Sequence, residues 1–271
     1  MKKRIPIKWK KPKGLSKKLL KRTAFTLLAL GLFGGGMLFS EGMEKLSARA
    51  SAEQKRKLPI YCVETEKPEI SISFDAAWGA DDTDELLRIL KENDVKATFF
   101  LCGFWVEKYP EEVKKIAAAG HDIGNHSATH PHMNALSAED IRKELQSCHD
   151  KVKELTGKDM DLFRPPFGEY NNTVIQTAFD MGYYPLNWDV DSLDWQEKGP
   201  QAEIDQVLNH KHIGNGSILL FHNDAKYTPQ VLDEIIKGLK EKGFSFVPIS
   251  ELILREGFEM DHEGRQRKAK N

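Results

Sequence analysis

The chain has 271 residues, enough for one large domain with a sizeable core, and its formal net charge is −1. Residues 1–22 carry eleven Lys or Arg and no Asp or Glu, so the rest of the chain carries about −12. This distribution argues against a nucleic-acid-binding protein, whose folded part would be basic. The three cysteines, Cys62, Cys102 and Cys148, allow at most one internal disulfide, and we expect them to be small buried side chains.

An uncharged apolar run at residues 24–40 follows the basic head at residues 1–23. The run lies at the short end of the length that a membrane-spanning helix needs. Its basic flank predicts that the N-terminus stays in the cytoplasm and that the bulk of the chain lies outside. We favour a retained single-pass membrane anchor, followed by a polar stalk at residues 41–67. The alternative is secretion after cleavage of a signal peptide at the small-x-small sequence of residues 48–50.

Strand-like and helix-like segments alternate from residue 68 onward. In the first predicted strand, residues 70–75, apolar and polar side chains alternate. Further strands are predicted at residues 95–101, near 122, and at 162–163, 183–187, 216–221 and 244–247. Helices are predicted at residues 85–92, 109–120, 137–156, 172–181, 201–212, 229–241 and 249–255.

These repeated strand–helix units predict an α/β domain at residues 68–256, with a parallel sheet covered by helices. Six or seven such units suit a barrel, in which chemistry collects where strands end and loops begin. Residues 257–271 are expected to form a charged, frayed tail.

Two histidines, His126 and His130, follow one of the predicted strands. Imidazoles at this spacing can face one metal ion if the segment makes a turn, and the glycine and proline beside it favour a loop-like turn. A structural pair is an equally good interpretation. His132 is a weaker third candidate ligand, because a proline separates it from His130.

Three further groups lie at predicted strand ends. Asp75 ends the first strand and either caps a turn or takes part in chemistry. The turn at residues 164–168 (Arg-Pro-Pro-Phe-Gly) is stiffened by two prolines and could offer backbone N–H groups to an oxyanion, or be only a rigid loop. His222 follows an apolar strand, a place suited to acid–base work or to a buried core histidine.

An acidic loop at residues 189–195 contains Asp189, Asp191, Asp194 and Trp195. Its carboxylates could bind a metal ion or orient a histidine, and its tryptophan could stack on a sugar. A solvated acidic loop is the alternative. Trp78 and Trp105 could also stack on sugar faces, but core positions suit them nearly as well.

In order and location, these groups resemble the five motifs of the polysaccharide deacetylase family, also called carbohydrate esterase family four. The resemblance spans about residues 70–250. It is closest in HSATH at residues 126–130, RPPFG at 164–168, DSLDW at 191–195 and LLFH at 219–222. The longer strings at residues 74–79 and 187–195 resemble those of spore-associated, firmicute-type members.

The resemblance implies a distorted (β/α) barrel of about seven strands that holds a divalent metal, usually zinc, with cobalt, manganese or nickel as alternatives. It implies that His126 and His130 are metal ligands, that Asp75 is the general base and that His222 is the general acid. Further roles are implied for the residues around them. Arg164 would orient Asp75, Asp194 would orient His222, the backbone of Phe167 would bind the oxyanion, and Trp195 and Leu219 would wall the acetyl pocket.

One position departs from the family pattern. The first motif normally has two adjacent aspartates, and the second completes the metal triad, but Ala76 stands in its place. Either the metal keeps two protein ligands, or another carboxylate substitutes. Asp82 and Asp81 are the nearest in sequence, and we choose Asp82, which could equally be just a helix cap.

The function that we expect is metal-dependent removal of N-acetyl groups from sugars of cell-wall or spore polysaccharide, or of peptidoglycan, with release of acetate. One alternative is a catalytically impaired carbohydrate-binding or spore-assembly protein on the same fold, which Ala76 favours. Another is an amidase that acts on a non-sugar substrate. We expect a monomer with the membrane as its further partner and no nucleic acid.

Overall fold

The computed structural model describes residues 56–269, which belong to one compact unit. The basic head, the predicted anchor at residues 24–40 and the possible cleavage sequence at 48–50 lie outside the described residues. Within residues 56–269, no helix is both long and apolar enough to cross a membrane.

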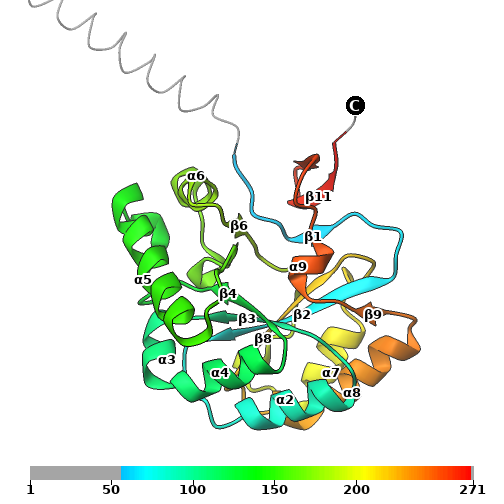
Figure 1. The fold of residues 1–271 in the computed structure, drawn as a ribbon. Helices are drawn as coiled ribbons and strands as arrows, with labels where there is room; N and C mark the ends of the chain where they lie inside the picture. Colours follow the sequence, from blue (N-terminus) through cyan, green and yellow to red (C-terminus); the bar gives the residue numbers. More distant parts are fainter. Residues whose placement is uncertain (1–55, 270–271) are drawn as a thin grey trace, which may run out of the picture. The chain divides into compact units, whose positions relative to one another are not determined.

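A curled parallel sheet forms the centre of this unit (Figure 1). Its strands follow the order β6-β5-β4-β3-β2-β8-β7, all neighbours are parallel, and β9 pairs with the beginning of β2. The strands are β2 (Glu69–Ala76), β3 (Thr98–Leu101), β4 (Asp122–Asn125), β5 (Leu162–Phe163), β6 (Tyr184–Pro185), β7 (Val190–Asp191), β8 (Ile218–His222) and β9 (Ser245–Phe246). The predicted α/β fold, a distorted barrel with about seven parallel strands, is confirmed.

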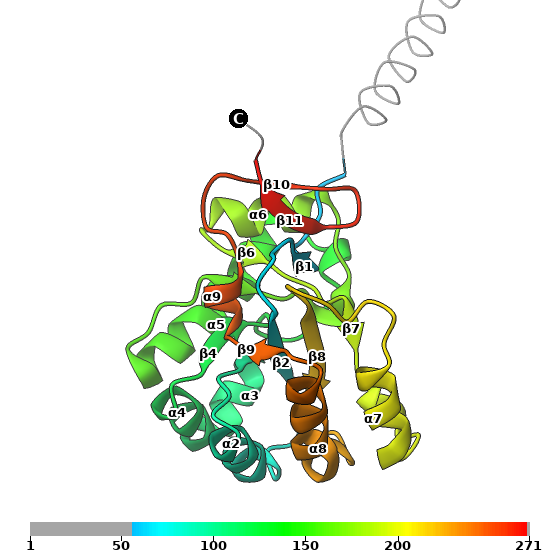
Figure 2. The same cartoon turned by 90° about the vertical axis from the view of Figure 1, so that its right-hand side faces the viewer.

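Helices surround the curled sheet, as Figures 1 and 2 show. They are α2 (Thr83–Glu92), α3 (Gly103–Lys108), α4 (Pro110–Ala118), α5 (Ala138–Thr156), α6 (Asn172–Asp180), α7 (Pro200–Leu208), α8 (Thr228–Glu241) and α9 (Ile249–Leu252). Three short 3₁₀ turns, η1 (Met133–Ala135), η2 (Pro166–Gly168) and η3 (Asp194–Gln196), lie in the loops. Each long helix turns an apolar face to the sheet, as Val231, Leu232 and Ile235 of α8 do.

The central strand β2 is buried on both faces, which is typical of a parallel strand between helix layers. On one face, Phe74 stacks on Phe99 with 4.9 Å between ring centroids. The polar residues of the alternating pattern, Ser71 and Ser73, are also buried. The Ser71 and Ser73 hydroxyls donate to the main-chain oxygens of Val247 and Leu219, each at 2.7 Å, which offsets the cost of burying them.

A second, small sheet joins the two ends of the described chain. It consists of β1 (Cys62–Val63), β11 (Arg265–Lys268) and β10 (Phe258–Met260), with β1 parallel to β11 (Figure 2). The prediction of a frayed tail at residues 257–271 is therefore wrong for residues 258–268. The predicted stalk at residues 41–67 is likewise wrong for its described part, where Ile60 and Val63 are buried.

Residues 60–63 also connect the two sides of the large sheet. The Ile60 amide donates to the Pro185 oxygen of β6, and the Val63 amide donates to the Gly216 oxygen just before β8, both at 2.9 Å. A side chain at position 216 would collide with Val63, since a Cβ there would lie 1.8 Å from the Val63 oxygen. This segment thus contributes to the closure of the curled sheet.

Candidate active site

A pocket of about 450 Å³ opens at the carboxyl ends of the central strands, where a (β/α) barrel carries its chemistry. Its size suits a small ligand or one sugar unit of a longer chain. It is lined by Asp75, Ala77, Trp78, His126, His130, Phe167, Trp188, Asp191, Trp195, Leu220 and His222. Seven of the residues that the sequence singled out, including Trp78, therefore come together with His222 around one cavity.

Asp75, at the end of β2, forms a buried ion pair with Arg164, which follows β5. Arg164 Nη1 donates to Asp75 Oδ1 at 2.8 Å, and its Nη2 donates to the main-chain oxygen of Asn187 at 3.2 Å. Burial alone would raise the pKa of Asp75, but the nearby Arg164, together with His126 and His222, holds it below its usual value. The carboxylate is therefore ionised, and its second oxygen faces the pocket histidines.

His222 ends β8, and its Cα is the register partner of Asp75. Asp194 holds it twice: the imidazole Nδ1 and the main-chain N of His222 each lie 2.7 Å from an Asp194 carboxylate oxygen. Burial would lower the pKa of His222, but the hydrogen bond and charge of Asp194 outweigh it and raise the pKa. Because Asp194 binds Nδ1, the Nε2–H of the protonated His222 imidazole is available to donate a proton to a leaving group in the pocket.

The loop after β4 carries His126 and His130 and is not helical, in agreement with the loop-like turn expected from its glycine and proline. Ser127 and His130 have positive φ values of 68° and 56°, which fold the segment back on itself. Glu144 of α5 holds the loop by accepting the Ala128 and Thr129 amides at 2.9 and 2.8 Å. The ring centroids of the two histidines lie 5.0 Å apart.

Both histidines are in the neutral form that binds metals. Burial lowers the pKa of His126, and it lowers the pKa of His130 to about 4. The Nδ1 of His126 lies 2.8 Å from the Arg164 carbonyl, which can only accept, so Nδ1 carries the proton and Nε2 has a free lone pair. That Nε2 lies 3.5 Å from Asp75 Oδ2, and two acceptors so placed favour a cation beside them.

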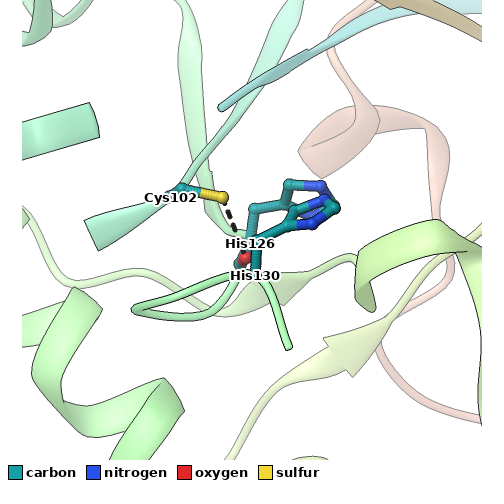
Figure 3. Close-up of side chains that lie close together, drawn as sticks. All are labelled: Cys102, His126 and His130. Carbon is teal, nitrogen blue, oxygen red and sulfur yellow. Dashed lines mark hydrogen bonds between the residues drawn. The ribbon is translucent and has the colours of Figure 1, made fainter. Parts of the chain in front are cut away.

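A third soft donor lies next to the histidines. The ligand atoms of Cys102, His126 and His130 all lie within 4.8 Å of one another, and the side chains are drawn in Figure 3. These residues fit a divalent metal such as zinc, which takes imidazole and thiolate ligands. The sequence analysis missed Cys102 as a site residue, although its place directly after β3, the strand beside β2, puts it at the same sheet edge as Asp75.

Exposed aromatic rings surround the pocket mouth. Trp78, Phe167 and Trp195 are 56%, 52% and 59% exposed, high values for large apolar side chains beside a cavity. Such rings can stack on the apolar faces of sugars. Trp105, the other candidate for stacking, is instead buried, and its indole N–H donates to the Gly79 oxygen. Trp188 also lines the pocket and was not predicted.

Two predicted site residues lie elsewhere. Asp82 is the N-cap residue of α2, outside the pocket lining and outside the group of metal-ligating atoms among the described residues, because the loop after β2 carries it beyond the strand end. Leu219 is buried in the core and does not line the pocket, whereas Leu220 does. Side chains alternate along a strand, so Leu220 shares the face of His222 and Leu219 shares that of Phe221.

The remaining candidates have local roles. His132 is not in the pocket lining: it lies 3.0 Å from Glu169 and stacks on Phe167. Asp189 accepts the Ile218 amide at 2.8 Å, which ties its loop to β8. Asp191 lines the pocket and accepts the Leu193 amide at 2.9 Å, so it shapes the loop that carries Asp194.

Comparison with known proteins agrees with this geometry. The family model described as polysaccharide deacetylase matches residues 63–186. An uncharacterized 30.6 kDa protein of Geobacillus stearothermophilus is 36% identical over 204 residues, which cover 74% of this chain and 76% of that protein. The chain belongs to the polysaccharide deacetylase family. Another family member, the peptidoglycan-N-acetylmuramic acid deacetylase PdaA of Bacillus subtilis, is 32% identical over 72% of this chain and 74% of its own.

The solved structures include one protein of carbohydrate esterase family four both as a pseudoenzyme and as a mutant with restored activity. Wild-type BA3943 of Bacillus anthracis, described as a pseudoenzyme of this family, is 36% identical, with a TM-score of 0.69 over 72% of this chain and 68% of its own. A BA3943 mutant described as having restored enzymatic activity is 37% identical, with the same TM-score, over 72% and 70% of the two chains. Membership of the family therefore does not by itself establish catalysis.

Proposed function

We propose that this chain is a metal-dependent deacetylase, which hydrolyses the N-acetyl group of sugars in peptidoglycan or in cell-wall or spore polysaccharide and releases acetate. The observation that carries the proposal is the pairing, across β2 and β8, of an ionised carboxylate with a histidine of raised pKa beside two neutral histidines. Relatives named as peptidoglycan deacetylases support the substrate class.

In this proposal, His126 and His130 would hold the metal, which would supply Lewis-acid chemistry for the amide carbonyl and for the attacking water. Asp75, positioned by Arg164, accepts the proton of the attacking water. His222, positioned by Asp194, donates a proton to the sugar nitrogen as the amide bond breaks. The backbone N–H of Phe167 stabilises the oxyanion, while Trp195 and Leu220 wall the space for the acetyl group.

The proposal also covers the place of action. The basic head and the apolar run at residues 24–40 would retain the protein at the cell membrane with the deacetylase domain outside the cytoplasm, as a monomer. Membrane fractionation combined with N-terminal sequencing of the mature protein tests this. An unprocessed N-terminus in the membrane fraction supports the anchor, whereas a soluble protein beginning at residue 51 supports secretion after cleavage.

The activity is tested with the full-length chain, purified in detergent and stripped with a chelator. Acetate release is measured from an N-acetylglucosamine oligomer and from peptidoglycan after zinc, cobalt, manganese or nickel is added back. We expect metal-restored acetate release that Asp75→Asn and His126→Ala abolish. His262→Ala is the matched control, since His262 is exposed and is not among the residues that line the pocket, and it should retain activity.

A second candidate is a catalytically impaired wall-binding or spore-assembly protein, which Ala76 and the likeness to the BA3943 pseudoenzyme favour. If the wild-type chain releases no acetate on either substrate and Ala76→Asp does, this second candidate holds. If the wild-type chain releases no acetate from either glycan substrate but cleaves a non-sugar acetamide, the chain is instead an amidase of a different substrate class.

A further inference from the structure

We propose that Cys102 supplies the third protein ligand of the metal site, in place of the carboxylate that Ala76 cannot provide. The inference rests on the proposed function, because it concerns the metal of the same site. It would make the ligand set two imidazoles and one thiolate, with a position left open for chemistry.

Cys102 lies beside Ala76 in the sheet. Ala76 is the register partner of Leu101, and Cys102 is the next residue along β3's chain direction. Its amide donates to the Ala76 main-chain oxygen at 3.0 Å. The strand next to β2 therefore places a sulfur ligand at the sheet edge where Ala76, the last residue of β2, has only a methyl side chain.

The thiol also faces the loop of the two histidines. Its Sγ donates to the main-chain oxygen of His126 at 3.3 Å, and Figure 3 shows the sulfur pointing toward the segment that carries both imidazoles. The three ligand atoms lie within 4.8 Å of one another. Bonds of about 2.3 Å to sulfur and about 2.0–2.1 Å to nitrogen put tetrahedral ligands about 3.5 Å apart, so a shift of roughly 1 Å completes the site.

The nearby carboxylates have other partners or roles: the Oδ2 of Asp75, 3.5 Å from His126 Nε2, is assigned in the proposed function to the proton of the attacking water. Asp75 is engaged by the Arg164 guanidinium, Glu144 by the backbone amides of the histidine loop, and Asp82 lies at the start of α2. Among the residues that the structure describes, Cys102, His126 and His130 form the group whose donor atoms can surround one ion. A thiolate carries the same single negative charge as the aspartate it would replace, so the net charge of the filled site is kept.

The ligand set predicts a metal preference. Thiolate is a soft ligand that favours zinc and cobalt, whereas manganese and magnesium favour carboxylate and water. A site with Cys102 should therefore bind zinc or cobalt much more tightly than manganese.

The decisive measurement is optical. The full-length chain, stripped of metal, is titrated with Co²⁺, because cobalt bound by a thiolate shows a charge-transfer absorption in the near ultraviolet that nitrogen and oxygen ligands lack. We expect this band to saturate at one Co²⁺ per chain. In Cys102→Ser we expect the band to disappear and the Co²⁺ affinity to fall at least tenfold.

Cys148→Ser is the matched control, since Cys148 is also a buried free cysteine and its Sγ likewise donates to a main-chain oxygen, that of Leu101, at 3.1 Å. It should keep the band and the affinity. The double variant Ala76→Asp/Cys102→Ser should regain tight Co²⁺ binding without the band, which also shows that loss in the single variant is not loss of the fold.

The result that overturns the inference is tight Co²⁺ binding by the wild-type chain without a thiolate band, or a band that survives in Cys102→Ser. Acetate release measured on the same samples separates this inference from the proposed function. Release without the band refutes only the Cys102 ligand. A Cys102-dependent band without release, on both glycan substrates, refutes only the deacetylase activity.

Discussion

Arg164 has no exposed side-chain surface, and its charge is balanced by a few specific partners. Asp75 accepts one of its hydrogen bonds, the main chain of Asn187 accepts another, and its guanidinium lies 4.2 Å above the Phe100 ring. Burying two charges is costly, so such a pair holds Asp75 in place more than it adds to stability.

Removal of one partner should therefore destabilise the fold strongly. We expect Arg164→Met to cost about 3–5 kcal/mol of unfolding free energy, because it leaves the Asp75 carboxylate buried and unpaired. The double variant Arg164→Met/Asp75→Asn should recover a good part of that loss. Urea unfolding measures both. Arg255→Met is the control: Arg255 pairs with Asp161 at a more exposed place and should cost about 1 kcal/mol or less. A small cost for Arg164→Met would contradict this account.

A second buried acid lies behind the His222–Asp194 pair. The Thr228 hydroxyl lies 2.8 Å from Glu203 Oε1 and 3.2 Å from Asp194 Oδ2. Burial raises the pKa of Glu203 to about 7, so the group stays protonated where an exposed glutamate is ionised. A neutral Glu203 can donate to Thr228, which then donates to Asp194.

This pKa predicts a pH-dependent stability. Between about pH 4.5 and 7 the unfolded chain releases the Glu203 proton while the folded chain retains it, so stability should fall as the pH rises, by on the order of 2 kcal/mol. Above pH 7 both states are ionised, and this contribution stays constant. Glu203→Gln cannot ionise and should remove this part of the slope. Unfolding curves from pH 4 to 8 provide the measurement, and an unchanged slope in the variant would refute the assignment.

Sequence patterns located the candidate site residues that belong to recognisable motifs. Asp75, His126 and His222 were found because each stands at a strand end, and His130 was found because its spacing from His126 lets two imidazoles face one metal ion. The wrong choices were those that depend on geometry beyond the motif. Whether Leu219 or Leu220 faces the pocket depends on how side chains alternate along β8. Cys102 comes close to Ala76, the last residue of β2, only because β3 pairs with β2 in the sheet. Nothing in the order of residues brings Cys102 to His126.

At the scale of elements, the histidine loop depends on helix α5. Glu144 accepts two backbone amides and the Thr129 hydroxyl, and buried Asn125 accepts the Ser127 amide at 2.9 Å. These bonds fix a loop that contains two residues of positive φ, a conformation that costs energy unless neighbours hold it.

We expect Glu144→Ala to loosen this loop and to weaken metal binding at the proposed site about tenfold, because Glu144 holds the two residues that precede His130 and so fixes the distance between the two histidines. Calorimetric titration with Zn²⁺ measures it. Glu154→Ala, on the exposed side of the same helix, is the control and should bind as the wild type does. Equal affinities in the two variants would mean that Glu144 does not support the site.

The predicted order of strands and helices was largely right, because apolar periodicity records burial against a sheet. The elements that the sequence did not reveal are short. Strand β7 has two residues inside a polar loop, and α3 has six residues between a strand and a longer helix. Neither is long enough to show a period.

At the scale of the whole described unit, β11 joins the last residues to the first. Gln266 is fully buried, and its side chain both donates to and accepts from the main chain of Leu254, at 2.7 Å each. Its main-chain oxygen accepts the Glu64 amide at 2.8 Å. A single polar residue thus connects the end of α9, β11 and the segment after β1.

We expect Gln266→Ala to destabilise the unit by about 2 kcal/mol, since it removes both hydrogen bonds of the buried Gln266 side chain to the partly buried main chain of Leu254 and leaves a hollow in its place. Thermal unfolding of the variant checks this. Gln201→Ala, on the exposed surface of α7, should change stability by less than about 0.5 kcal/mol. If both variants melt alike, the C-terminal strand does not contribute to the stability of the unit.

The charged character of residues 257–271 concealed this arrangement, because β11 is short and has the sequence Arg-Gln-Arg-Lys, without an apolar residue, although it is the central strand of the small sheet. Its consequence concerns the order of events in time. The chain is made from its N-terminus, so residues 60–63 leave the ribosome about two hundred residues before their partner β11 does. The small sheet can form only after β11 has been synthesised. Until then, the backbone N–H and C=O groups of β1 that pair with β11 in the fold are unpaired, and they are available for incorrect pairing with other strands.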